Sequence, residues 1–270
     1  PPYLDPECLN MPSLPRFKLP EPRVSPVPAL EIFLYAAALC AIAALTMYYP
    51  LAANIPLNIV LPVALLLLGF AHGPFAWIKI GTLTLGRILI VITVLGVVSG
   101  ALSVTIMFWL WRLNILEALV KDAKEGRWPS ALIGTVVMAT SFLLEGVWVG
   151  DYFIVPSAAM IFWYAGYTIW HWNFCVLNFT RPLALFHIAV LAAPWLFVAV
   201  TQDFGPWMMM RGNSLTFAGC LHIAFEGWIN QRLKYDAFSQ KSAFLERRST
   251  QLLILAAVSL LCLAAWFARG

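Results

Sequence analysis

The side chains that could do chemistry in this sequence are few, and most of them stand inside long apolar stretches. A charge placed in the hydrocarbon core of a membrane costs several kcal/mol, so ionisable residues persist there mainly where they are paired or functional. The residues that meet this description are His72, Glu145, Asp151, His171, His187, His222 and Glu226. They are therefore the candidates for a functional site.

Three histidines and one glutamate are expected near the same face of the membrane, which carries residues 121–127 and is called face A below. Counting 1.5 Å per residue from the expected helix ends puts His171, His187 and Glu226 at similar depth. His222 would lie one turn deeper than Glu226 on the same side of one helix, because positions four apart share a face. Imidazole and carboxylate groups bind transition metals, so the sequence predicts a metal site at this depth. Its expected ligands are His171, His187, His222 and Glu226.

The segment 163–179 (WYAGYTIWHWNFCVLNF) is dense in aromatic residues. Trp170 and Trp172 flank His171 and would form a flat, polarizable wall suited to haem, a chlorin or carotenoid pigment, or a quinone. Two imidazoles at equal depth on neighbouring helices are also what ligation of a haem or pigment requires. The cofactor-binding residues expected from this pattern are His171, His187, His222, Trp170 and Trp172. The alternative is that the aromatic stripe packs helices and the histidines only hydrogen-bond at helix interfaces.

A second group of titratable side chains is expected near the opposite face. Glu145, in FLLEGVWVGDYF, would be the deepest of them, while Asp151 and His72 would lie within a turn of water. Glu145 and Asp151 could act as a general acid and its partner on an amphipathic substrate, or relay protons to a quinone. The sequence therefore predicts both as catalytic, with solvated helix ends as the alternative.

The composition requires that membrane-spanning helices carry these residues. Of 270 residues, 61% are hydrophobic and 11% are charged, and the mean hydropathy is +0.82. Soluble domains are roughly 45–50% apolar and about 25% charged. Because one span takes roughly 20 apolar residues, the chain holds at most about eight spans and no separate soluble domain. The expected fold class is an all-α, polytopic membrane helix bundle with seven or eight transmembrane helices.

Eight apolar windows define the expected spans. They cover residues 29–48, 51–71, 84–111, 131–149, 154–177, 182–201, 214–230 and 251–268. Residues 114–128 (NILEALVKDAKEGRW) are amphipathic and too polar to span, so they are expected to form a helix lying at the membrane interface.

Residues 1–28 hold nine of the 18 prolines and precede the expected transmembrane domain, residues 29–270. Such a run cannot be helical over any length, which predicts an extended tail outside the bilayer. The apolar side chains of the tail have no internal core to enter, so we expect it to contact another membrane protein subunit. Three spans before residues 121–127 would put the tail on the face opposite face A, and the excess of basic residues on face A would make that face cytoplasmic.

Membrane lipids are the expected partners of the 17 basic residues, because these are dispersed and form no footprint for nucleic acid. The five cysteines include no CxxC pair and predict no disulfide framework. Three functions remain open. The first is a subunit of a redox or photosynthetic, energy-transducing membrane complex that binds haem, pigment or metal. The second is a membrane enzyme acting on a lipid or isoprenoid, and the third is a transporter or channel subunit lined by Glu145 and Glu226.

Overall fold

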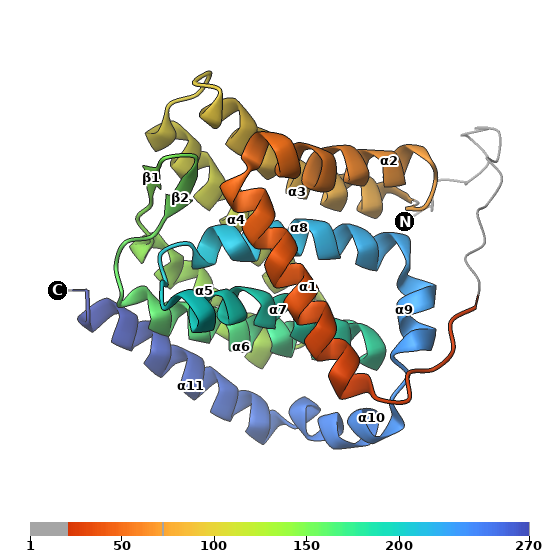
Figure 1. Ribbon diagram of the computed structural model, residues 1–270. Coiled ribbons are helices and arrows are strands. Elements are labelled where there is room, and N and C mark those ends of the chain that lie inside the picture. The colour runs from red at the N-terminus through yellow and green to blue at the C-terminus, as the bar shows by residue number, and fades with distance from the viewer. Residues whose placement is uncertain (1–20, 72, 270) are drawn as a thin grey trace, which may run out of the picture.

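The computed structural model describes residues 21–71 and 73–269 as a bundle of long helices with one short hairpin (Figure 1). The α-helices are α1 (Pro28–Tyr48), α2 (Leu61–Leu67), α3 (Gly73–Val94), α4 (Gly100–Lys124), α5 (Trp128–Thr140), α6 (Met160–Asn178), α7 (Arg181–Thr201), α8 (Trp207–Ala224), α9 (Glu226–Arg232), α10 (Asp236–Ser242) and α11 (Arg248–Phe267). Short helical segments are the π-helices η2 (Pro50–Asn54) and η3 (Pro56–Val60) and the 3-10 helices η4 (Ser141–Leu143) and η5 (Ala243–Glu246). The strands β1 (Val147–Val149) and β2 (Tyr152–Ile154) pair antiparallel.

Six helices in the described part of the chain are long and apolar enough to cross a membrane. They cover Pro28–Tyr48, Pro50–Leu67, Ala76–Val94, Gly100–Lys124, Arg181–Thr201 and Arg248–Phe267, and a shorter apolar helix covers Trp128–Leu143. Two further helices, α6 and α8, have 19 and 18 residues and bury more than half of their side chains against the others. Because protein rather than lipid surrounds α6 and α8, they can carry polar side chains. The expectation of an all-α, multi-pass membrane bundle is confirmed.

The third predicted window, 84–111, is not one span. A turn at residues 95–99 divides it between α3 and α4, where Gly96 takes a φ of +75° and the Ser99 hydroxyl accepts a hydrogen bond from Leu102 N–H. Glycine adopts this left-handed conformation without steric cost, and a serine at the N-cap satisfies a free backbone donor. The chain therefore makes one more helix here than the hydropathy pattern predicted.

The prediction of a separate interfacial helix at 114–128 is also wrong. Residues 114–124 are the last three turns of α4, and their polar side chains contact protein. Lys79 Nζ lies 2.9 Å from Asn114 Oδ1 and 2.7 Å from Glu117 Oε2. Asp122 is fully buried and accepts hydrogen bonds from Ser130 Oγ at 2.6 Å and Asn178 Nδ2 at 2.7 Å. Polar partners on α3, α5 and α6 thus replace the water that the amphipathic pattern indicated.

The loops gather at two ends of the bundle. At face A, Arg127 donates to Asn178, Arg181 pairs with Glu246, and Arg232 donates to the Arg23 carbonyl. At the other end, Tyr48 contacts Tyr152 with ring centroids 5.6 Å apart, Val155 N–H donates to the Gly205 carbonyl, and Arg269 pairs with Glu145. The beginning of α1 and the whole of α9 lie at one end in Figure 1, and the C-terminus lies at the other.

The segment leading into α1 is therefore on face A, not opposite it as expected. The extra helix created by the turn at 95–99 gives four crossings instead of three before residues 121–127. Residues 21–27 form no helix, and Ser25 N–H donates to the Arg232 carbonyl at 2.9 Å. Most of the predicted tail, residues 1–20, lies outside the described residues, so its contact with another subunit stays a prediction.

Aromatic side chains on α6 form much of the core. Trp163, Tyr164, Tyr167 and Trp170 are each at most 3% exposed. Tyr164 stacks on Trp207 of α8 with ring centroids 4.4 Å apart, and Trp163 stacks on Tyr167 at 5.3 Å. These contacts fix the rotation of α6 about its axis, and so determine where the next turn, beginning at His171, points.

Candidate functional site

A cavity of about 350 Å³ opens among helices α3, α4, α6, α7 and α8 toward face A. Its walls are mainly apolar and aromatic and also carry charged side chains and three imidazoles. The lining residues that matter below are Lys79, Glu117, Lys121, His171, His187, His222 and Glu226. The structure thus brings together all four residues that the sequence predicted as metal ligands, on the wall of one cavity.

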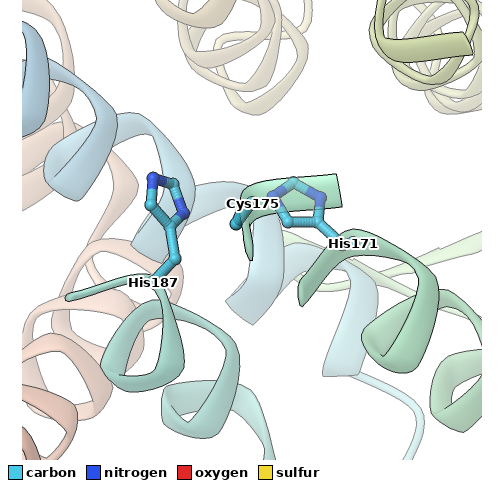
Figure 2. A group of neighbouring side chains, drawn as sticks. All are labelled: His171, Cys175 and His187. Atoms are coloured by element: carbon cyan, nitrogen blue, oxygen red, sulfur yellow. The ribbon is translucent and has the colours of Figure 1, made fainter. Parts of the chain in front are cut away.

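The closest cluster of ligand atoms consists of His171 and Cys175 on α6 and His187 on α7. One nitrogen of each imidazole and the Cys175 Sγ all lie within 4.8 Å of one another. His171 and Cys175 share a helix face because they are four residues apart. Figure 2 shows Cys175 between the two imidazole rings, with the His187 ring facing it from the neighbouring helix.

His187 and His222 form a second contact in the same cavity. His187 Nε2 lies 3.1 Å from His222 Nδ1, and their ring centroids are 5.2 Å apart and nearly perpendicular. His187 is 4% exposed, and its Nδ1 has no hydrogen-bond partner in the described chain. Phe179, in the loop between α6 and α7, stacks on the His187 ring and meets His222 edge-on. Phe179 therefore packs against both rings. Because Nε2 of His187 faces His222, Nδ1 is the nitrogen of that ring without a partner among the described residues.

His171 has polar neighbours at both ring nitrogens. Tyr167 Oη lies 3.2 Å from Nδ1, and Arg211 Nη2 of α8 lies 3.4 Å from Nε2. Arg211 is fully buried, forms no ion pair with a carboxylate of the described residues, and leaves Nε and Nη1 without partners. A positive charge thus stands beside the His171–Cys175–His187 cluster. A group of opposite charge in the cluster would be electrostatically complementary to it.

Glu226 lines the cavity but does not continue the helix of His222. The chain breaks at Phe225, with φ −125° and ψ 29°, so His222 ends α8 and Glu226 begins α9. The expectation that these two residues share one helical stripe is therefore wrong, and the Glu226 side chain lies at the cavity mouth.

Trp170 lines the cavity as expected for a cofactor wall, whereas Trp172 turns away and donates from Nε1 to the Ala184 carbonyl at 3.3 Å.

The two predicted catalytic carboxylates lie at the opposite end of the bundle from this cavity. Glu145 is not deep in a span, because the helix of the fourth window ends at Leu143. The Glu145 side chain is 76% exposed and forms an ion pair with Arg269. Asp151 occupies the two-residue turn of the hairpin, next to Gly150 at φ +57°. His72 lies outside the described residues. The expectation that Glu145 lies deep in a span is wrong, and Asp151 lies at the end of the bundle, near water as expected.

The pattern VWVGDYFI contained a signal for the hairpin. β-branched and aromatic residues on both sides of a Gly-Asp pair are typical of a tight hairpin. Cys175 offers a second signal, because its spacing of four from His171 places both on one helix face. Nothing in the sequence alone connected Arg211 with His171, since 40 residues separate them.

The fold and the cavity define a class, namely a multi-pass helical membrane protein with a histidine-lined interior site. Comparisons with protein-family models, with curated proteins and with solved structures found no match to this chain.

Proposed function

We propose that this chain is an integral membrane subunit of a redox or energy-transducing complex and that it holds one soft transition-metal ion, copper first, between His171, Cys175 and His187. The observation that carries the proposal is the convergence of two imidazoles and a thiol within 4.8 Å. Thiolate selects copper(I) and zinc, and imidazole accepts both, so copper is the redox-active ion that this set favours.

The distances support a bare metal ion after a small adjustment. Bonds of 2.0–2.3 Å in tetrahedral geometry would put ligand atoms about 3.3–3.8 Å apart. The cluster spans up to 4.8 Å, so rotation of the side chains has to close a gap of about 1 Å. A haem bound by both histidines would have to lie between the two imidazoles, and the Cys175 thiol lies within 4.8 Å of a nitrogen of each. This favours an ion over a bis-histidine haem.

The neighbourhood of the cluster also suits a metal–thiolate group. Binding deprotonates the thiol, so the ligand set brings a negative charge next to the unpaired guanidinium of Arg211. If His187 binds through Nδ1, its Nε2 keeps the proton and donates to His222 Nδ1. A hydrogen bond of this kind orients a ligating imidazole in many metal sites.

Metal analysis of the protein purified in mild detergent tests the proposal. We expect about one copper per chain, loss of the metal in Cys175→Ala and in His187→Ala, and retention in Cys220→Ala. Cys220 is the matched control because it is a buried free thiol of α8 that packs in an apolar cluster with Leu65 and Ile80. Stoichiometric zinc would keep the site and remove the redox role, and a preparation without stoichiometric metal would reject the proposal.

A second candidate is a membrane enzyme acting on a lipid or isoprenoid, and the 350 Å³ cavity with its largely apolar wall is the observation that favours it. In that case the histidines would be the acid and base, because Glu145 and Asp151 lie at the far end of the bundle. Retention by the purified protein of a lipid that His187→Ala loses, in the absence of metal, would favour this candidate.

A further inference from the structure

A second buried site lies next to the histidine cavity and deeper in the bundle. It is a space of about 50 Å³ among α3, α4 and α8. Arg87, Trp111 and Thr216 are among its polar lining residues, and it shares Leu83, Asn114, Tyr167 and Leu215 with the larger cavity. One water-sized sphere needs about 10–15 Å³, so this space has room for more than one water or for a small ion.

The uncommitted polar groups of this space are hydrogen-bond donors. Arg87 Nε and Trp111 Nε1 are both buried and have no partner among the described residues. Neither side chain can accept a hydrogen bond. The other polar groups have committed their protons locally, since Thr82 Oγ1 donates to the Lys79 carbonyl and Thr216 Oγ1 donates to the Gly212 carbonyl. The two free donors, a guanidinium N–H and an indole N–H, therefore lack an acceptor among the described residues, although the threonine hydroxyl oxygens of the lining keep lone pairs.

The charge of Arg87 is also uncompensated. Arg87 is 8% exposed, donates from Nη1 to the Asn213 side chain, and forms no ion pair within the described chain. A desolvated guanidinium is strongly unfavourable without a counter-charge, and in a membrane an unpaired ionisable group points to a ligand or a pathway. The backbone is adapted to this placement, because a Cβ on Gly212 would lie 2.9 Å from Arg87 Nη2.

We propose that this space binds one monovalent anionic group, held by Arg87 Nε and Trp111 Nε1. The group is either a halide-sized inorganic ion or the carboxylate of an amphiphile whose apolar chain extends into the adjoining 350 Å³ cavity. Both sources offer the same chemistry, a compact negative charge that accepts hydrogen bonds from the guanidinium and the indole N–H. The inference is independent of the metal proposal, because neither Arg87 nor Trp111 contributes to the His171–Cys175–His187 cluster.

The test measures thermal unfolding of the detergent-solubilised protein at constant ionic strength, with sodium chloride exchanged for sodium isethionate, whose anion is bulky. Chloride at ten times its dissociation constant should raise the midpoint by about 3–6 °C. Arg87→Gln should abolish this rise, and Trp111→Phe should move the chloride response to concentrations about tenfold higher or more. If Arg87→Gln does not fold, Trp111→Phe still decides the question.

Arg112→Gln is the matched control. Arg112 is also 8% exposed, but it donates from Nε and Nη2 to Ser141 and lies over the Phe142 ring, so it has no unmet donor of this kind. Its chloride response should equal that of the wild-type protein.

A second arm replaces chloride with decanoate, and decanol controls for the apolar chain. Stabilisation by decanoate alone, lost in Trp111→Phe, identifies the carboxylate source. No stabilisation by either anion would overturn the proposal. A response in Trp111→Phe equal to that of the wild-type protein would also overturn it, because the anion would then bind without the indole N–H.

Discussion

His187 Nε2 lies 3.1 Å from His222 Nδ1, although 35 residues separate the two along the chain. The contact joins α7 to the end of α8, and it leaves the opposite nitrogen of His187 directed at no partner within the described chain. In the proposed metal site the two histidines would therefore have different roles. His187 would bind the ion through Nδ1, and His222 would accept the hydrogen bond that orients His187.

His222→Ala should lower metal affinity about 10–100-fold without abolishing binding, because an orienting partner is lost while the ligands remain. His187→Ala should abolish stoichiometric binding. Competition with a chelator of known affinity measures both. Glu226→Gln is the control, since this carboxylate lines the same cavity but lies at its mouth. Equal losses in His222→Ala and His187→Ala would show that His222 is itself a ligand.

Gly134→Ala should destabilise the protein by about 1–3 kcal/mol, because an added methyl group overpacks a filled contact. A Cβ at Gly134 would lie 2.9 Å from Trp170 Nε1, and Trp170 precedes His171 on α6. Gly81→Ala is the matched control, since it is also a helical glycine but has no atom within 4 Å of the new Cβ. Alanine there should be neutral or stabilise by up to about 1 kcal/mol. Thermal unfolding in detergent compares the two, and equal effects would contradict the packing argument.

Asp122→Ala should lower the free energy of unfolding by about 1–3 kcal/mol, because the buried Ser130 hydroxyl loses its acceptor. Ser130 and Asn178 both donate to this carboxylate, and Asn173 links Ser130 to Gln251 on α11. Asp151→Ala, at the exposed tip of the hairpin, should change stability by less than about 0.5 kcal/mol. Comparable unfolding midpoints for the two variants would show that the Asp122 network contributes little.

The grouping of the loops predicts the orientation of the chain. The described basic residues at face A are Arg23, Lys121, Lys124, Arg127, Arg181, Arg232, Lys234, Arg247 and Arg248, while Arg269 lies at the opposite end. Because Lys and Arg are enriched on the cytoplasmic side, face A should be cytoplasmic. In sealed vesicles of known sidedness, a membrane-impermeant maleimide should label Lys234→Cys only from the cytoplasmic side and Asp151→Cys only from the other. The wild-type chain, with its own cysteines, sets the background, and labelling of both variants from one side would contradict the arrangement.

The sequence by itself determined the solvent of this protein and its all-α class. An apolar content of 61% can be satisfied only in lipid, where the backbone must bond internally, and helices follow from that requirement. Depth could also be estimated, because a helix rises by a fixed distance per residue, and His171, His187, His222 and Glu226 do line one cavity.

Only the tertiary structure decided which of these side chains meet. Depth says nothing of the direction in which a residue faces around its helix, and that direction is set by packing such as the stack of Tyr164 on Trp207. The turn at 95–99, which moved the segment before α1 to face A, depends on one left-handed glycine inside an unbroken apolar run. Cys175 lies beside His187, and Arg87 and Trp111 line one small space, because of how consecutive helices are rotated against each other. Such contacts leave no periodic signal, because each residue type is chosen for a neighbour that the linear sequence does not reveal.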